Sequence, residues 1–344
     1  MKALVLEDVK KLTVTEVPDP TIDDDGIIIK VKANGVCRSD WHFWNGDLPI
    51  TQEILGHEFV GIVEEVGKNV KRFKPGDRVI VPFSGGDGTC EYCVSGKPHL
   101  CESSFIPGMT YPGGYAEYVA VPYGDRNVVH LPEGVDFVEG AALGCRFMTS
   151  YSGITAKANV RPGEKVVVYG CGGIGLSAIH VAANIGAIVI AVDINDNNLE
   201  LAKKMGAQYT INSRNTDPVE TIKDLTNGGA DVSVDALGIP DTCVNGILSL
   251  KKGGRHLQIG VNKMGEEGRI PLPITEMVMS EIQLITTLGM PAHHYEPMLA
   301  QVALGKLQPG KMVSGEISLS EVEKIFEDMS NFNVTGTYVV TKFE

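Results

Sequence analysis

A glycine-rich loop between a predicted strand and a predicted helix constrains the fold more than any other feature of the sequence. Residues 165–169 form an apolar run of strand length, and residues 174–185 have the apolar spacing of a helix that ends at Gly186. The loop between them has the spacing G-x-G-x-x-G, which allows a tight turn, lets backbone N–H groups approach a pyrophosphate, and permits close helix–sheet contact. The chain has 40 glycines, so the spacing alone is weak, but its place between a strand and a helix predicts a dinucleotide site. The residues expected to contact the cofactor are Gly170, Gly172, Gly173, Ile174 and Gly175.

An acidic residue at the end of the next predicted strand indicates which dinucleotide is bound. Residues 187–193 form that strand, and Asp193 can accept hydrogen bonds from the adenosine ribose while it repels a 2′-phosphate. The residues that follow, 194–196, include no Arg or Lys to receive such a phosphate. The sequence therefore predicts NAD rather than NADP. The alternative is a glycine turn and a strand-end acid that bind no ligand.

The second part of the chain alternates between strand-like and helix-like segments. This alternation begins at about residue 150 and predicts a parallel sheet covered by helices on both faces. Six strands are expected, which is the number in a complete doubly wound dinucleotide fold. The predicted strands are 165–169, 187–193, 209–212, 231–236, 255–260 and 283–288.

The first part, up to about residue 145, has a different pattern. Its apolar or alternating stretches are short and bounded by turn residues, which predicts an irregular all-β domain such as a partial barrel. Beyond about residue 293, the tail has an amphipathic helical segment, 320–329, and a final β-type run, 335–342. We expect the tail to pack on the first part, so that the dinucleotide-binding domain is an insertion.

Composition argues against several partners and indicates a compartment. The formal net charge is −13, and no apolar run approaches the roughly 20 residues of a membrane span, so nucleic acid and membrane are poor candidate partners. Acidic residues near the N-terminus stand where a signal peptide has its apolar stretch, which predicts a cytoplasmic protein. The seven cysteines are an odd number, and in a reducing compartment they favour metal binding or catalysis over disulfides.

Several cysteine and histidine residues have a spacing that suggests a metal site. Each is a weak signal alone, because a single buried Cys is most often a small apolar residue. Together they resemble the zinc signature of the medium-chain alcohol dehydrogenases, and the resemblance extends over essentially the whole chain. The segments that carry it are the hexapeptide 37–42, the triplet Gly56-His57-Glu58, the residues Gly61, Gly67 and Val70, the segment 85–93 and the glycine loop.

The resemblance implies a fold of the class α/β plus β. Residues 1–148 and 291–344 are expected to form a GroES-like partial β-barrel catalytic domain. Residues 149–290 are expected to form an inserted Rossmann domain, a doubly wound parallel sheet that binds NAD. Relatives of this length are commonly homotetramers, so a homotetramer is favoured over a dimer.

The resemblance also implies a reaction. Cys37, His57 and Cys145 are the implied ligands of a catalytic zinc, and their three donors leave the fourth tetrahedral position open for an alcohol oxygen. The implied reaction is a reversible hydride transfer between an alcohol and NAD that gives an aldehyde or ketone. Zinc polarises the alkoxide or carbonyl oxygen.

By the same resemblance, residues beside the ligands have defined roles. Ser39 takes the substrate proton, and His42, reached through the nicotinamide ribose, passes it to solvent. The alternative for both residues is ordinary surface polarity. The other implied roles belong to Asp40, which orients His57, to Glu58, an acid behind the metal, and to Arg38, a contact to the pyrophosphate.

A second group of cysteines resembles the lobe that holds a structural zinc in many relatives. Cys90, Cys93 and Cys101 match the pattern, but the position of its fourth Cys is occupied by Asp87. A carboxylate oxygen also binds zinc, so the implied site has three sulfurs and one oxygen and is weaker than a four-thiolate site. We therefore expect two zinc ions per chain, one more easily removed than the other. The alternative is a lobe without metal.

The tail departs from the family pattern in one position. Relatives often have Gly-Arg near the C-terminus, where the Arg contacts a cofactor phosphate, whereas Thr337 follows Gly336 here. If Thr337 occupies that position, the loss of a charge-assisted hydrogen bond weakens NAD binding by about 1.5–3 kcal/mol.

Aromatic residues near the expected site indicate the class of substrate. Their apolar walls favour apolar or aryl alcohols, primary or secondary, over sugars, although core packing is an equal alternative for Phe43 and Phe105. Cys145 stands where polyol dehydrogenases of the family have a carboxylate, which also favours simple alcohols. The aromatic residues are Trp41, Phe43, Trp44, Phe83, Phe105 and Tyr111.

Other functions stay open on the same scaffold. One is a polyol, amino-alcohol or glutathione-adduct dehydrogenase. Another is a zinc-free quinone reductase, against which the trio of Cys37, His57 and Cys145 argues. The third is a non-catalytic nucleotide-binding sensor, which would not need Ser39 and His42 beside three metal ligands.

Overall fold

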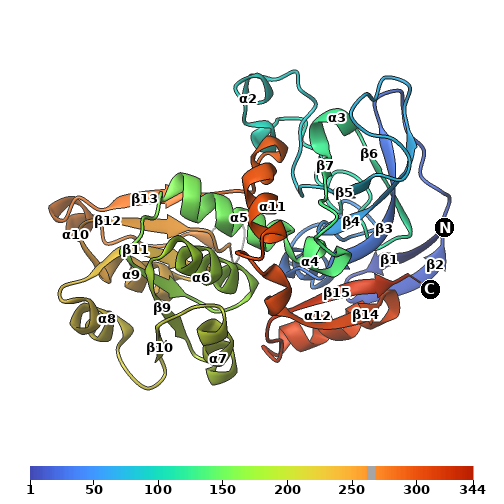
Figure 1. Ribbon diagram of the computed structural model, residues 1–344. Helices are drawn as coiled ribbons and strands as arrows, with labels where there is room; N and C mark the ends of the chain where they lie inside the picture. The colour runs from blue at the N-terminus through green and yellow to red at the C-terminus, as the bar shows by residue number, and fades with distance from the viewer. Residues whose placement is uncertain (262–267, 344) are drawn as a thin grey trace. The chain divides into compact units, whose positions relative to one another are not determined.

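The computed structural model describes residues 1–261 and 268–343, and the chain divides into two compact units (Figure 1). Unit 1 comprises Met1–Met148 and Gly289–Glu344, and unit 2 comprises Thr149–Leu288. Among the described residues, no helix combines the length and the apolar character needed to span a membrane.

Unit 2 is built on a six-stranded sheet whose neighbouring strands are all parallel. The order is β10-β9-β8-β11-β12-β13, so the chain moves outward from β8 to β10 and then returns to β11 on the other side of β8 (Figure 1). Doubly wound sheets bind ligands beside such a reversal, at the carboxyl ends of the strands. The predicted parallel sheet is thus present. The strands are β8 (Lys165–Tyr169), β9 (Ile188–Asp193), β10 (Tyr209–Asn212), β11 (Ala230–Asp235), β12 (Leu250–Gln258) and β13 (Gln283–Thr286).

The helices of unit 2 explain why its inner strands are apolar throughout. Val166, Val167 and Val168 of β8 are completely buried, as expected for a parallel strand covered on both faces. Helix α6 ends at Gly186, whose φ of +97° is a left-handed conformation that glycine adopts without strain. The helical segments are α5 (Cys145–Ser152), which runs on from unit 1 into the π-helical turn η2 (Gly153–Lys157), then α6 (Gly173–Ile185), α7 (Asp196–Lys204), α8 (Pro218–Thr226), α9 (Pro240–Leu248) and α10 (Ile274–Met279).

Unit 1 is built on a seven-stranded sheet of order β14-β15-β3-β4-β5-β7, with β6 also paired to β3, and a separate hairpin of β1 and β2. The long strand β3 pairs with β6 through residues 27–30 and with β15 through residues 34 and 35. Register shifts between β3 and β4 mark bulges, which bend a sheet and increase its twist. The strands are β1 (Lys2–Asp8), β2 (Lys11–Glu16), β3 (Ile27–Gly35), β4 (Phe59–Val66), β5 (Arg78–Ile80), β6 (Tyr118–Val121), β7 (Val129–His130), β14 (Val313–Ser318) and β15 (Thr337–Lys342).

The tail of the chain completes unit 1. Strand β15 pairs with β3, and helix α12 packs on α1, where Trp44 contacts Phe326. Helix α12 coincides with the amphipathic segment seen in the sequence, whereas α11 was not predicted. The helical segments are α1 (Arg38–Trp44), α2 (Glu91–Val94), η1 (Pro98–Leu100), α3 (Gly124–Asn127), α4 (Phe137–Ala142), η4 (Ala292–His294), α11 (Tyr295–Ala303), η5 (Pro309–Met312), η6 (Leu319–Glu321) and α12 (Val322–Ser330).

Candidate active site

The predicted ligands of the catalytic metal come together in unit 1. Cys37 lies just before α1, His57 lies just before β4, and Cys145 begins α5. Their potential ligand atoms, and one carboxylate oxygen of Glu58, all lie within 4.8 Å of one another. Cys37, His57 and Glu58 are buried, and Cys145 is half-buried. Segments far apart in the sequence thus form one cluster, called the distal cluster below, of two sulfurs, an imidazole and a carboxylate.

The orientation of the His57 ring is fixed by a buried carboxylate. Nδ1 of His57 lies 2.9 Å from Oδ1 of Asp40, which also accepts from the Gly56 N–H at 3.0 Å. The other oxygen of Asp40 accepts from the Tyr115 hydroxyl at 3.1 Å. Because the carboxylate accepts, Nδ1 carries a proton, and Nε2 is the ring nitrogen that can offer a lone pair to a metal. That Nε2 is buried and, within the described residues, has no hydrogen-bond partner, so its lone pair is available to a metal, and a zinc ion fits this donor set.

The pKa values of the two thiols in the distal cluster shift in opposite directions. A hydrogen bond from Cys145 holds the pKa of the Cys37 thiol well below its usual range, and the charge of Arg146 acts in the same direction. The same hydrogen bond, together with burial, raises the pKa of Cys145 well above its usual range. Cysteine binds a metal as the thiolate, so a cation bound here would displace the protons of both sulfurs.

An ion pair beside these ligands was not anticipated from the sequence. Arg146 donates to Oε1 of Glu58 through its side-chain Nε at 3.0 Å and through its backbone N–H at 3.2 Å. Its terminal nitrogen also donates to Oε2 of Glu58. Burial raises the pKa of Glu58, and the charge of Arg146 opposes this shift. The glutamate expected behind the metal is therefore held by an arginine next to the ligand Cys145.

The two predicted relay residues lie on α1, close to Cys37. The Cys37 thiol lies 3.7 Å from the Ser39 hydroxyl. His42 is one helical turn further along, so the two side chains emerge from neighbouring positions on one side of the helix. Nδ1 of His42 lies 2.7 Å from Oδ2 of Asp47. A hydroxyl and an imidazole thus lie beside the distal cluster, in an arrangement that could carry a proton outward from it.

Arg38 is held by the tail of unit 1. Its guanidinium lies 4.3 Å from the Trp41 ring and donates to the Met329 carbonyl at 3.3 Å. Burial lowers the pKa of Arg38. Thr337, considered above as the counterpart of a family arginine, is buried, and its hydroxyl donates to the Met312 carbonyl at 3.3 Å.

The aromatic residues expected to line the pocket have mainly a structural role. Among them, Phe83 lies against the candidate metal ligand His57, and the two ring centroids are 6.0 Å apart. Tyr111 is partly exposed and contacts Phe105 edge-on at 5.1 Å. The remaining four are buried in the two cores of unit 1: Trp41, Phe43 and Trp44 pack in the core with α12, and Phe105 packs in the core formed by β3 and β4.

The second predicted metal group also comes together, called the lobe cluster below. The ligand atoms of Asp87, Cys90, Cys93 and Cys101 lie within 4.8 Å of one another. Oδ1 of Asp87 lies 3.5 Å from the Cys101 sulfur and 3.8 Å from that of Cys93. Backbone hydrogen bonds, first that of Cys93, lower the pKa of Cys90 to about 7, whereas burial raises that of Cys101 to about 12. The carboxylate therefore stands where a fourth thiolate would.

Two residues hold Asp87 in this position. Thr89 donates to the Asp87 carboxylate through its backbone N–H at 2.8 Å and through its hydroxyl at 2.9 Å. The buried side chain of Asn127 holds Gly86, the residue before Asp87. It accepts from the Gly86 N–H at 3.0 Å and donates to the Gly86 carbonyl at 3.2 Å. Sequence reasoning missed Asn127, because no local motif connects it to the lobe.

The glycine loop of unit 2 has the geometry of a phosphate cradle. Gly170 has a φ of +88°, which favours glycine. A Cβ at Gly175 would collide with the carbonyl of Gly170, so the third glycine permits the close contact expected of it. A Cβ at Gly172 would meet no atom within 4 Å, so the backbone there faces open space at the start of α6. This arrangement fits a pyrophosphate at the helix N-terminus.

Asp193 is tied to the same loop. Its Oδ2 accepts from the Cys171 N–H at 2.7 Å, and its Oδ1 accepts from the Asn195 N–H at 2.8 Å. The acid at the end of β9 thus lies beside the glycine turn, as a ribose-binding acid must.

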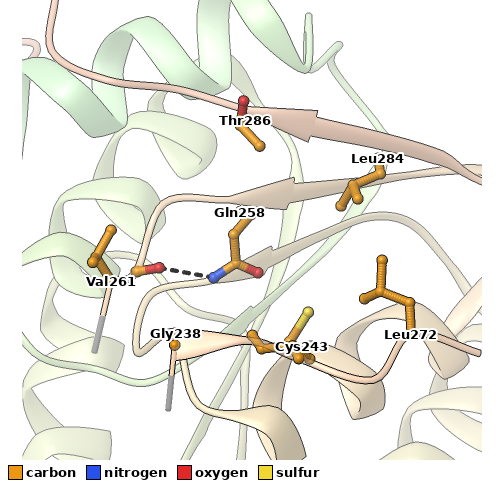
Figure 2. A pocket seen from close by; sticks show the side chains of 10 residues that line it. Gly238, Cys243, Gln258, Val261, Leu272, Leu284 and Thr286 are labelled. Atoms are coloured by element: carbon orange, nitrogen blue, oxygen red, sulfur yellow. Dashed lines mark hydrogen bonds between the residues drawn. The ribbon is translucent and has the colours of Figure 1, made fainter. Parts of the chain in front are cut away.

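A cavity of about 250 Å³ lies in unit 2, at the carboxyl ends of β11, β12 and β13 (Figure 2). Figure 2 shows Gln258 in its wall, donating to the Gly260 carbonyl at 2.9 Å, with Leu272 and Leu284 on the apolar side. Gln258 also donates to the buried Asp235 at 2.8 Å, and that carboxylate accepts from the Leu237 N–H at 2.9 Å. Sequence analysis did not point to this cavity.

Comparisons with known proteins agree with this geometry. Residues 23–133 match the family model described as alcohol dehydrogenase GroES-like domain, and residues 173–303 match the model described as zinc-binding dehydrogenase. An alcohol dehydrogenase of Geobacillus stearothermophilus is 34% identical, over 99% of this chain and 98% of that protein. An NAD-dependent alcohol dehydrogenase of Sulfurisphaera tokodaii is 33% identical, over 99% of each chain.

Solved structures lead to the same family. The alcohol dehydrogenase TADH from Thermus sp. ATN1 superposes with a TM-score of 0.92 at 31% identity, over 99% of this chain and 100% of that one. These findings confirm the fold class, the enzyme class and the two cofactors, zinc and NAD, that the sequence predicted. The chain belongs to the zinc-dependent medium-chain alcohol dehydrogenase family.

Proposed function

We propose that this chain transfers hydride reversibly between NAD and an apolar or aryl alcohol, primary or secondary, at a zinc ion held by Cys37, His57 and Cys145. The observation that supports this most directly is the buried Nε2 of His57, which has no hydrogen-bond partner in the part of the chain that the structure describes and belongs to a cluster with two thiols. When bound, zinc supplies Lewis acidity that lowers the pKa of an alcohol hydroxyl.

The residues around the ligands prepare that site. Asp40 fixes the tautomer and the angle of His57, so that the imidazole offers a lone pair without rotating. Two thiolates and one neutral imidazole balance the charge of a divalent cation. The partly buried position of the cluster keeps water away from a reacting carbon, which favours hydride transfer over side reactions.

We assign the movement of the substrate proton to α1. Ser39 accepts the proton of the alcohol hydroxyl, and its place next to Cys37 supports this role. His42 then passes the proton to solvent, and Asp47 orients its ring. An imidazole is suited to this step because it can accept a proton at one ring nitrogen and release one from the other.

The cofactor is held by the glycine loop and by the acid beside it. The backbone N–H groups at Gly172, Gly173, Ile174 and Gly175 receive the pyrophosphate, and Asp193 accepts from the adenosine ribose. Arg38 adds a positive charge for the pyrophosphate. The open space at Gly172 and the position of Asp193 support this assignment.

A second zinc is proposed in the lobe, bound by Asp87, Cys90, Cys93 and Cys101. This site has four protein donors and no open position, which is typical of a structural zinc. It contributes to stability and takes no part in the chemistry.

The larger organisation is proposed on the same basis. Residues 1–148 and 291–344 form the catalytic domain, and residues 149–290 form the NAD-binding domain. Seven cysteines without disulfide bonds fit a cytoplasmic protein. The apolar side chains exposed on α10 and β13 fit a homotetramer, because exposed apolar patches often mark protein interfaces. Those exposed side chains are Ile274, Val278, Met279 and Leu284.

A direct assay tests the proposal. Purified protein with NAD and a panel of primary, secondary and aryl alcohols should produce NADH, and zinc analysis should give two ions per chain. Cys37→Ser should abolish NADH production and remove one zinc. If no alcohol of the panel is oxidised and Cys37→Ser leaves the zinc content unchanged, the proposal is wrong.

A further inference from the structure

Glu58 is a fourth potential ligand of the distal cluster. One of its carboxylate oxygens lies within 4.8 Å of the ligand atoms of Cys37, His57 and Cys145. Zinc also binds carboxylate oxygen, besides nitrogen and sulfur. With Glu58 bound, the site would have two sulfurs, one nitrogen and one oxygen, all from the protein. A site with four protein ligands is closed and of the structural kind, with no position for an alcohol.

Arg146 already occupies the oxygens of that carboxylate. Its Nε and its backbone N–H both donate to Oε1, at 3.0 and 3.2 Å, and its terminal nitrogen donates to Oε2. This two-point contact matches the planar fork of a guanidinium, and hydrogen bonds between two charged groups are among the strongest in proteins. The pair is buried, so water competes little with it.

The backbone around the pair leaves room for it. A Cβ at Gly35 would collide with Oε2 of Glu58, and a Cβ at Gly144 would lie 2.5 Å from the Glu58 Cβ. Gly35 ends β3, and Gly144 immediately precedes the ligand Cys145. Two glycines thus provide the space that lets the carboxylate turn toward Arg146.

We propose that Arg146 is a positioning residue that holds Glu58 off the metal and so keeps the fourth coordination position open for substrate. This inference rests on the proposed function, because it requires a metal on Cys37, His57 and Cys145. Arg146 acts on the fourth position through its hydrogen bonds to Glu58, so its removal should close that position only while Glu58 is a carboxylate.

The test compares five forms of the full-length protein with cobalt(II) in place of zinc: wild type, R146Q, R146K, E58Q and R146Q/E58Q. Imidazole is the probe, because it is a neutral nitrogen ligand that needs an open position on the metal. Its binding is followed by the visible absorption of cobalt, and the kcat/KM for an alcohol is measured on the zinc forms. Arg255→Gln, which breaks a half-buried ion pair with Glu164 in unit 2, is the matched control.

The expected pattern is specific to a carboxylate that competes for the metal. R146Q should weaken imidazole binding by roughly tenfold or more, with a similar loss of kcat/KM. R146K, which keeps the charge but not the two-point contact, should lie between R146Q and wild type. E58Q and the double variant should both bind imidazole nearly as wild type does, and R255Q should show no change.

Several outcomes would overturn the inference. R146Q that binds imidazole as tightly as wild type is one, and a double variant no better than R146Q is another. If R146Q fails to fold, R146K decides the question, because unchanged imidazole binding in R146K would contradict the proposed role. If wild type shows no imidazole-sensitive cobalt signal that Cys37→Ser removes, the proposed function itself fails, and the inference fails with it.

Discussion

The distal cluster and the lobe cluster are built in opposite ways. In the distal cluster the ligands come from three segments far apart in the sequence, and buried charged side chains hold them. In the lobe cluster all four candidate ligands lie between residues 87 and 101, two of them are only half-buried, and hydrogen bonds from Thr89 and from the side chain of Asn127 hold Asp87 and the residue before it. The first therefore depends on charged side chains in the folded core of unit 1, whereas the second takes its donors from one loop, which Asn127 anchors.

With zinc at both clusters, as proposed above, the comparison shows how one ion can have a catalytic role and a structural role. A cluster assembled by the core can keep three ligands rigid and leave a fourth position open, because the core supplies the stability. A cluster made by one loop stabilises that loop only if every position is filled. The substitutions that follow each change one of these two features.

His57→Ala should have the largest effect, because it removes one of only three protein ligands. We expect the loss of one zinc per chain and a fall in kcat of about a thousandfold or more, since a bound metal ion contributes several kcal/mol of transition-state stabilisation. Elemental analysis and the NADH assay measure both. The zinc of the lobe cluster should remain. Loss of both zinc ions would show that the two clusters are not independent.

Asp40→Asn should have a smaller effect on the same cluster. Asparagine is neutral, so it loses the charge that orients His57. In one of its two orientations, the amide also turns its NH2 group toward the N–H groups of Gly56 and His57, which are themselves donors. A loss of about 10–100-fold in zinc affinity or in kcat/KM is expected. The matched change is Thr89→Ala, which removes one hydrogen bond to Asp87 and should leave kcat/KM unchanged. Equal kcat/KM for Asp40→Asn and wild type would contradict the assigned role.

Asp87→Cys tests the lobe cluster by completing a set of four thiolates. Zinc release to a chelator should become slower for one of the two ions, and Asp87→Ala should make it faster, by roughly tenfold in either direction. The kcat of both variants should stay close to that of wild type, because the lobe takes no part in the chemistry. Release kinetics that do not respond to either change would mean that the lobe holds no zinc through Asp87.

Asn127→Asp should have the smallest effect of the four. The aspartate keeps an oxygen for the Gly86 N–H but loses the donations to the carbonyls of Gly86 and Pro122. Leaving these groups unsatisfied should cost about 1–3 kcal/mol in the free energy of unfolding. Chemical denaturation measures this loss, and the lobe zinc should leave faster. If zinc instead left the distal cluster faster while its release from the lobe cluster stayed unchanged, Asn127 would support the distal cluster and not the lobe.

Much of this architecture could be predicted from local patterns. The strand, glycine loop and helix at residues 165–185 are specified by neighbouring residues, and so is the alternation that builds the parallel sheet. The ligands Cys37, His57 and Cys145 could be named only because their spacing resembles a known family. The geometry that unites them depends on long-range packing, which one sequence does not display.

The features that were missed share a physical cause. No local pattern in α5 marks Arg146, and its partner Glu58 is set by the approach of two distant segments. Asn127 likewise reaches Gly86 only in the folded protein. Trp41 and Trp44 look like pocket residues because they flank a ligand, but α12 covers them, so they belong to the core. Side-chain partners across the fold are the part that periodicity cannot supply.

The bond between Asp193 and the Cys171 N–H has a consequence for the redesign of coenzyme preference. The acid serves as a brace for the phosphate-binding turn even before any nucleotide arrives. Replacing Asp193 to admit NADP would therefore also remove a hydrogen bond that holds that turn. A successful swap would therefore have to include a substitute acceptor for the loop amide.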